Sequence, residues 1–136
     1  MTYPCTGTIR YEARPVSLNV SYGHHRRQRT EHVQEWRDTF AMLALTVPRA
    51  DRNLEAVHVE VRCGMSGKLQ DIGNCYVSAK AAIDGLVKAK IIADDTGDQI
   101  LSLKFYPPER ISPAELDYLE LTWIEALPES LEETNG

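Results

Sequence analysis

Hydrophobic and polar residues alternate along several stretches of the chain, and this two-residue period predicts β-strands. Residues 57–63 show it most clearly, because the apolar side chains at alternate positions would share one face: Val57, Val59, Val61 and Cys63. Residues 6–11 and 99–106 also alternate, and apolar residues at every second position from Leu119 to Trp123 mark a last strand. The sequence therefore predicts a small β-sheet with an apolar face.

Two other stretches follow a helical period. Between Thr30 and Pro48, apolar residues recur at steps of three and four: Val33, Trp36, Phe40 and Leu43. Thr30 is a suitable N-cap, and we expect Trp36 in the core rather than stacked on a base. A second helix is predicted from about Cys75 to Lys90, whereas residues 16–29 should form a long loop. The pattern indicates an α/β (α+β) fold, in which a small mixed β-sheet packs with two main helices.

Length and composition fit one globular domain. Of the 136 residues, 43% are hydrophobic and 26% are charged. We expect a single domain over residues 1–127 and an acidic, disordered tail over residues 128–136. Because no apolar run is long enough to span a bilayer and the first residues lack a signal-peptide core, we expect a cytoplasmic protein without a membrane partner. Three cysteines without a CxxC pair fit a reducing compartment and structural roles in the core.

The net charge of −5 is distributed unevenly along the chain. Residues 1–50 hold seven Arg or Lys and four Asp or Glu, whereas residues 107–136 hold one and eight. The acidity is therefore concentrated near the C-terminus, and the cluster of Arg26, Arg27 and Arg29 can form a local positive face. Taken alone, such a short basic run is more often a solvated loop.

Acidic residues open and close the stretch with the clearest chemistry. Asp71 begins it, and the pair Asp94–Asp95 ends it, on either side of the second predicted helix. Magnesium prefers oxygen ligands from one or two carboxylates together with water and phosphate. These residues could therefore hold a magnesium ion if residues 91–93 turn back as a strand beside Asp71. Besides metal ligation, the run DDTGD has two other interpretations, an ordinary turn and a weak match to a calcium-binding loop.

The helix between these acidic residues carries a charged stripe. Lys80, Asp84 and Lys88 lie four residues apart, so they share one face. One interpretation is a salt-bridge ladder that contributes only about 0.3 kcal/mol per pair. The other is that the Lys80 ammonium group stabilises negative charge developing on a phosphate, with Asp84 orienting it.

The order of these residues resembles the signature of the RusA family, whose members are Holliday-junction resolvases common in phages and prophages. The similarity rests on the runs Asp71-x-x-Asn74, Lys80-x-x-x-Asp84-x-Leu86 and Asp94-Asp95. Two flanking segments add to it, namely Pro15 to Asn19 with Tyr22 and the basic run His24 to Arg29, and Leu119 to Thr122. The resemblance extends over residues 6–126 and implies a RusA-like fold. It also implies a structure-specific endodeoxyribonuclease of DNA recombination and repair.

The resemblance further implies roles for single residues. Asp71 and Asp95 would be catalytic metal ligands, supported by Asn74 and Asp94, and the cofactor would be Mg²⁺, with Mn²⁺ as a substitute. Lys80 would be catalytic beside the scissile phosphate. The residues that would bind DNA are Arg26, Arg27, Arg29 and Lys68. The expected partners are branched DNA, in particular a four-way junction, and a second copy of the chain, because a twofold homodimer matches the two strands to be cut.

The chain departs from the family pattern at two points. Gly73 stands where the pattern has a second aspartate, and about three extra residues, close to one helical turn, separate Asn74 from Lys80. A glycine offers no side-chain oxygen to a metal. A catalytically weakened or inactive junction-binding protein is therefore the alternative function. A small structural or protein-interaction domain without a nucleic-acid role is a third.

Overall fold

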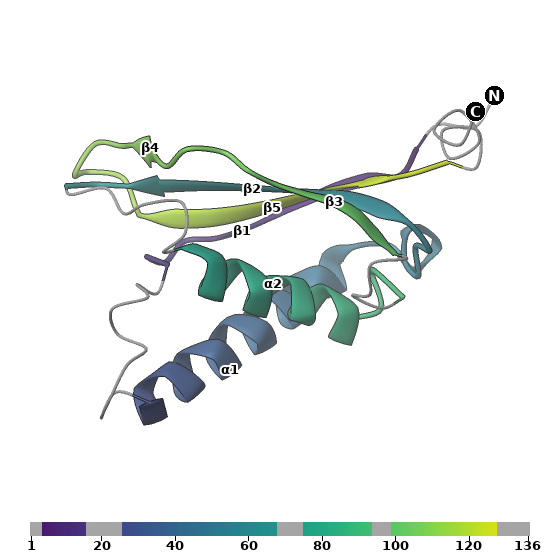
Figure 1. Ribbon diagram of the computed structural model, residues 1–136, viewed down its shortest axis with the longest axis horizontal. Helices are drawn as coiled ribbons and strands as arrows, with labels where there is room; N and C mark the ends of the chain where they lie inside the picture. The colour runs from purple at the N-terminus through teal and green to yellow at the C-terminus, as the bar shows by residue number, and fades with distance from the viewer. Residues whose placement is uncertain (1–3, 16–25, 68–74, 94–98, 128–136) are drawn as a thin grey trace.

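Five strands form one mixed sheet in the computed structural model, which describes residues 4–15, 26–67, 75–93 and 99–127 (Figure 1). The strands are β1 (Thr6–Tyr11), β2 (Val57–Met65), β3 (Ile100–Phe105), β4 (Glu109–Arg110) and β5 (Tyr118–Glu125). Their order is β1-β5-β2-β3, and β4 pairs with the end of β2. β5 lies antiparallel to β1 and β2, whereas β3 and β4 lie parallel to β2. The expected fold, a small mixed sheet with two main helices, is confirmed.

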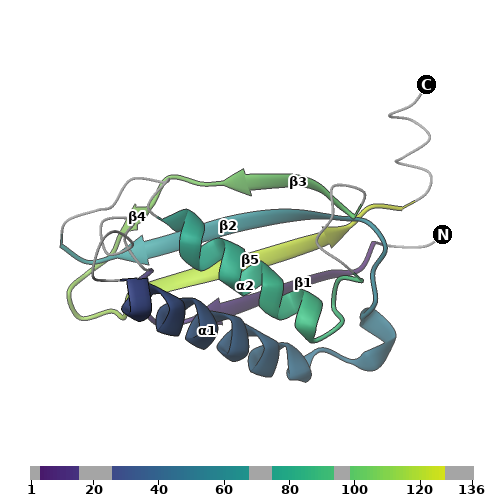
Figure 2. The same ribbon diagram turned by 60° about the horizontal axis from the view of Figure 1, so that its bottom comes forward.

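Two helices, α1 (Arg26–Leu43) and α2 (Tyr76–Lys88), cover one face of this sheet (Figures 1 and 2). The chain passes from α1 to β2 through two 3₁₀ turns, η3 (Ala44–Thr46) and η4 (Arg49–Asp51). The helices run in the same direction, because Val33 in the first half of α1 and Tyr76 at the start of α2 line one hollow. Further along, Asp38 of α1 pairs with Lys88 at the end of α2.

The core lies between the sheet and the helices. The side chains of Val57, Val59 and Val61 on β2 are buried, as the alternation predicts. From α1, Trp36 and Phe40 pack against them, and Trp36 is only 1% exposed. The ring of Tyr11 meets Trp36 edge-on, with ring centroids 4.9 Å apart. The prediction that Trp36 belongs to the core is confirmed.

Gly85 allows the two helices to approach each other closely. A Cβ atom at this position would overlap the backbone oxygen of Arg37 and would lie 2.9 Å from Phe40 Cβ. Real Cβ contacts shorter than 3.0 Å are essentially never seen. The absence of a side chain at Gly85 therefore sets how near α2 can lie to α1.

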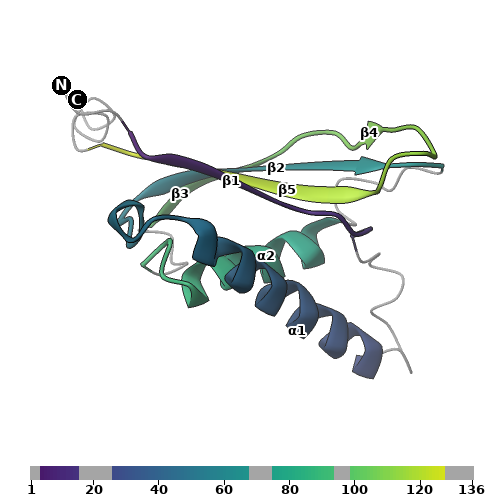
Figure 3. The ribbon, with the colours of Figure 1, turned by 180° about the vertical axis from the view of Figure 1, so that it is seen from behind.

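No helix among the described residues covers the opposite face of the sheet (Figure 3). By the alternation along the strands, this face carries polar side chains. Its charges are paired across neighbouring strands: Arg10 Nη2 lies 2.9 Å from Glu120 Oε2, and the guanidinium of Arg10 lies 3.8 Å from the centre of the Tyr118 ring. Arg62 covers the ring of Tyr106 in the same way, at 4.0 Å. These pairs make this face a solvated surface with its charges largely balanced.

The structure differs from the predicted elements at a few boundaries. α1 begins at Arg26, so the long loop expected over residues 16–29 is wrong for its last four residues. These four residues are good helix formers or neutral, but no apolar residue among them reveals the helical period. β2 extends two residues beyond the expected end, and the short strand β4 was not expected. No helix in the described part of the chain is both long and apolar enough to cross a bilayer.

Candidate functional site

All four predicted metal ligands lie outside the described residues. These are Asp71, Asn74, Asp94 and Asp95, and the expected DNA contact Lys68, the departure at Gly73 and the tail over 128–136 lie outside them too. Their convergence on one cation therefore stays a prediction. Within the part of the chain that the structure describes, no three His, Cys, Asp or Glu side chains gather as a metal site. The described part of the candidate site is the pair Lys80 and Asp84 with the surface around it.

Lys80 lies on the side of α2 that faces solvent. Its Nζ is 3.4 Å from Asp84 Oδ1, and the two side chains are 45% and 35% exposed. A pair this exposed stabilises the helix by only about 0.3 to 0.5 kcal/mol. Lys88 does not extend this ladder along α2, because its Nζ lies 2.9 Å from Asp38 Oδ1 of α1. The i,i+4 contact is thus present, and the third member of the stripe links the two helices.

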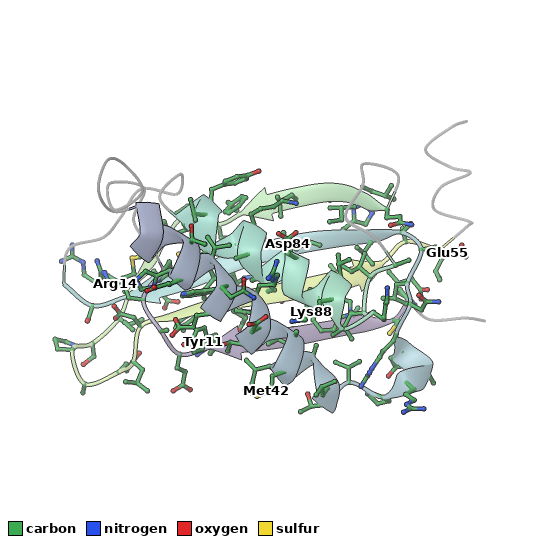
Figure 4. All side chains as sticks on the ribbon, turned by 90° about the horizontal axis from the view of Figure 1, so that it is seen from below. Tyr11, Arg14, Met42, Glu55, Asp84 and Lys88 are labelled. Atoms are coloured by element: carbon green, nitrogen blue, oxygen red, sulfur yellow. The ribbon has the colours of Figure 1, made fainter. Side chains whose placement is uncertain are left out.

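A groove between α1 and α2 contains these charged side chains. One hollow, of about 180 Å³, is lined by Val33, Tyr76, Val77, Lys80, Ala81 and Asp84. A second, of about 450 Å³, is lined by Arg37, Asp84, Val87 and Lys88. Figure 4 shows Asp84 and Lys88 on α2. Asp84 lines both hollows. Three cationic side chains line the groove, and two carboxylates pair with them, Asp84 with Lys80 and Asp38 with Lys88.

Arg37 contributes an unsatisfied donor to this groove. Its Nε atom is buried and has no hydrogen-bond partner among the described residues, although Asp38 Oδ1 lies 3.9 Å away. A buried donor without an acceptor is costly, so such groups in proteins usually meet a bound water, ion or ligand.

The two acidic segments join the described structure at opposite ends of α2. The segment with Asp71 leads into the helix through Cys75, whereas the segment with Asp95 follows Ala93 beyond its end. The N–H of Ala93 donates to Leu54 O at 3.1 Å, so the chain after α2 pairs with the residues that lead into β2. Where we expected a strand over residues 91–93, only Ile92 makes an isolated β-bridge, to Leu54; its position relative to Asp71 lies outside the described residues. Because a helix of 13 residues is about 20 Å long, the borders of the two segments are far apart.

The basic run lies at the end of the molecule where α2 begins. Arg26, Arg27 and Arg29 belong to the first turn of α1 and not to a loop as expected. Since the helices run in the same direction, this turn is on the same side as Tyr76, the first residue of α2. Both helices therefore direct their partly positive N-terminal ends toward the side from which the segment with Asp71 enters.

A partly exposed ion pair that the sequence did not reveal holds the chain at the end of β2. Asp117 accepts hydrogen bonds from the backbone N–H of Ser66 at 2.9 Å and from Arg14 Nη1 at 2.9 Å. The backbone hydrogen bond from Ser66, together with Arg14, lowers the pKa of Asp117. Arg14 also donates to Ser66 O. Residues 103 positions apart make this contact, so no local signal in the sequence could have predicted it.

Comparisons with known proteins identify no family. No protein-family model and no curated protein matches the sequence. The structure is similar to crystal structures of the hydrogenase maturation protein HypE, at 8% identity and a TM-score of 0.35 in one and, for the E. coli protein, at 10% and 0.39. The matches cover 94% and 93% of this chain, which spans only 33% and 32% of the HypE chains. Scores this low do not indicate a shared fold, so these neighbours carry no information on function.

Proposed function

We propose that this chain is a metal-dependent endodeoxyribonuclease that resolves four-way (Holliday) DNA junctions, as its RusA-like motif implies. The observation that supports this most is the position of Lys80. The lysine of the motif lies at the surface, in a groove with two further cationic side chains, Arg37 and Lys88, where a phosphate can reach it. We propose that the enzyme acts in the cytoplasm as a homodimer on branched DNA.

The donor set of the motif fits magnesium. Asp71 and Asp95, with Asn74 and Asp94, supply carboxylate and amide oxygens, which are the hard ligands that this ion prefers. When bound, Mg²⁺ or Mn²⁺ would supply an activated water and neutralise charge on the leaving oxygen. The carboxylates would hold the cation beside the scissile phosphate, and the Asn74 amide would take part of the place of the aspartate that Gly73 lacks.

Lys80 would stabilise the phosphate during hydrolysis. Negative charge grows on the non-bridging oxygens as water attacks, and a preorganised ammonium group lowers the free energy of that state. Asp84 limits the freedom of the ammonium through its 3.4 Å contact. Asp84 is thus a positioning residue, and Lys80 is the group that would contact the substrate.

DNA would approach the ends of α1 and α2 at which both helices begin. Arg26, Arg27 and Arg29 belong to the first turn of α1 there, and helix N-termini favour phosphate groups. Within the groove, the side chains of Arg37 and Lys88 add positive charge near Lys80. Such contacts read the DNA backbone and not its bases, so we expect binding that depends strongly on salt and weakly on sequence.

The separation of the two acidic segments sets a condition on the metal site. Because their borders lie at opposite ends of α2, Asp71 and Asp95 can share a cation in two ways. Either both segments reach along the helix within one chain, or a second chain supplies one carboxylate. Mixing Asp71→Asn and Asp95→Asn variants separates the two, since only a site shared between chains regains activity in mixed dimers.

Cleavage of a labelled four-way junction tests the proposal. We expect the parent to cut in Mg²⁺ or Mn²⁺, Asp95→Asn to be inactive, and Lys80→Met to lose at least about 100-fold in cleavage rate. Lys104→Met is the matched control, because it removes the same charge from the opposite face of the sheet, where Lys104 lies 4.6 Å from the ring of Tyr106. Equal rates for the Lys80 and Lys104 variants would contradict the role of Lys80.

Gly73 supports a second candidate, a junction-binding protein with weak or no cleavage. One carboxylate fewer lowers metal affinity, whereas DNA binding through the cationic groove would be unchanged. The Gly73→Asp variant distinguishes the two candidates. Binding without cleavage by the parent, with cleavage restored by Gly73→Asp, would favour the binding protein. A parent that neither binds nor cuts junctions at low salt would exclude both.

A further inference from the structure

Two cysteines that are distant in the sequence lie side by side at the joint between β2 and α2. Cys63 is near the end of β2, and Cys75 directly precedes the first residue of α2. Their Sγ atoms are 3.4 Å apart and hydrogen-bonded, and both residues are buried, with 3% and 1% of their surface exposed. With Met65 they form a small cluster separate from the main core. The absence of a CxxC motif concealed this pair in the sequence.

The contact between the two sulfur atoms is close to what a disulfide needs. A disulfide bond is about 2.05 Å long, so the sulfur atoms must approach by only about 1.4 Å. A free cysteine in a protein core ordinarily behaves as a small hydrophobic side chain, and Cys5, which is partly buried and packs against the main core, fits that description. Cys63 and Cys75 differ because each places its sulfur against the other.

Both partners are held by the fold on elements that do not depend on this contact. On one side, β2 is paired along its length with β5, and Met65 pairs with Arg110 of β4. On the other side, α2 packs against α1 through Gly85. The fold therefore keeps the two sulfur atoms near each other whether or not they are bonded, and this raises their effective concentration above that in the unfolded chain.

We propose that Cys63 and Cys75 are a redox-active dithiol, which exchanges with low-molecular-weight disulfides such as glutathione disulfide to form a reversible intrachain disulfide. When local opening of the joint exposes one of the sulfur atoms, its thiolate attacks the external disulfide, forms a mixed disulfide and releases one thiol. The second cysteine then attacks the mixed disulfide and releases the other thiol. Two protein thiols are oxidised, one external disulfide is reduced to two thiols, and both protons pass to the released thiols. The product ties the end of β2 to the start of α2.

The test equilibrates the full chain in buffers with a series of ratios of reduced to oxidised glutathione. Acid quenching, alkylation after denaturation and peptide mass spectrometry then measure the fraction of chains with a Cys63–Cys75 disulfide. The same titration in urea measures the unfolded chain. We expect the equilibrium constant for the disulfide to be at least about tenfold larger in the folded protein, and the oxidised protein to unfold at a higher temperature than the reduced one.

The Cys5→Ser variant is the matched control, because it removes the third thiol and leaves the pair intact. It should give the same titration as the parent. Equal equilibrium constants in the folded and unfolded chains, or glutathione adducts without a Cys63–Cys75 cross-link, would overturn the proposal. It does not rest on the nuclease activity, since every measurement reports the state of the thiols.

Discussion

The close approach of the helices at Gly85 makes a sharp prediction about stability. Replacing Gly85 by Ala should destabilise the protein, although alanine is the better helix former. The added Cβ would overlap the backbone oxygen of Arg37 and would lie 2.9 Å from Phe40 Cβ. Since the first of these atoms belongs to the backbone of α1, a rotamer change cannot relieve the overlap, and α1 must shift.

The expected change in the free energy of unfolding follows from two opposing contributions. Overpacking in a well-packed core costs up to about 3 kcal/mol, and the overlap with helix backbone places this position in the upper part of that range. Helix propensity returns about 1 kcal/mol when alanine replaces glycine. The net loss in the free energy of unfolding should be about 1 to 2 kcal/mol. In a domain of this length, this corresponds to a fall in Tm of about 3 to 8 °C.

Urea unfolding followed by tryptophan fluorescence measures this loss, because Trp36 and Trp123 are each only 1% exposed and will report the loss of the core. Gly67 is the matched control, since it has a φ of +73° and a Cβ there would meet nothing within 4 Å. At Gly67, alanine and leucine should lower the free energy of unfolding by the same amount, because both act through backbone strain alone. At Gly85, leucine should cost clearly more than alanine. A Gly85→Ala variant as stable as the parent, or more stable, would refute the reasoning.

Three further predictions concern other parts of the structure. Gly7→Ala should cost about 1 to 3 kcal/mol in urea unfolding, because its Cβ would overlap the indole ring of Trp123; unchanged stability would show that the ring can move aside. Hydrogen bonds from the Ser66 N–H and Arg14 lower the pKa of Asp117, so the folded protein binds fewer protons in acid than the unfolded chain does. The stability that Asp117 contributes is present above the ordinary aspartate pKa of about 3.9 and is lost as the pH falls through the lowered pKa. Asp117→Asn should therefore lower the free energy of unfolding by about 1 to 2 kcal/mol at pH 7. The stability of this variant should also fall less steeply in acid than that of the parent. A variant with the parent's pH profile would count against this. Arg10→Ala should cost at most about 1 kcal/mol by the same unfolding assay, since its contacts with Glu120 and the Tyr118 ring lie on an open face, and a loss above about 2 kcal/mol would contradict this.

Local patterns were sufficient to predict most elements of the fold. Alternation in residues 57–63 identified the central strand, because a sheet covered on one face selects apolar residues at every second position. The spacing of Trp36 and Phe40 identified the buried face of α1 in the same way. The first turn of α1 escaped because Arg26 to Arg29 include no apolar residue, and β4 escaped because two residues are too few to show a period.

The candidate site was predictable only in part. The spacing of Lys80 and Asp84 showed that they share a helix face, and the structure confirms their contact at 3.4 Å. The groove beside Lys80 and Asp84 depends on how α1 packs on α2. The residues next to Lys80 and Asp84 in the sequence do not reveal that packing. The unsatisfied Nε of Arg37 in that groove was equally invisible, because burial of a single atom depends on elements that meet only in the folded chain.

By itself, the sequence determined most of the secondary structure, the apolar faces and the charged stripe on α2, because these depend on the period of residues along a single element. Only the tertiary structure decided which distant residues meet. It brought Arg14 to Asp117 and Cys63 to Cys75, and it directed the chain after α2 to Leu54. The reason is that such contacts depend on the order of the strands and on how the helices pack. The same local pattern of apolar and polar residues is compatible with several such arrangements.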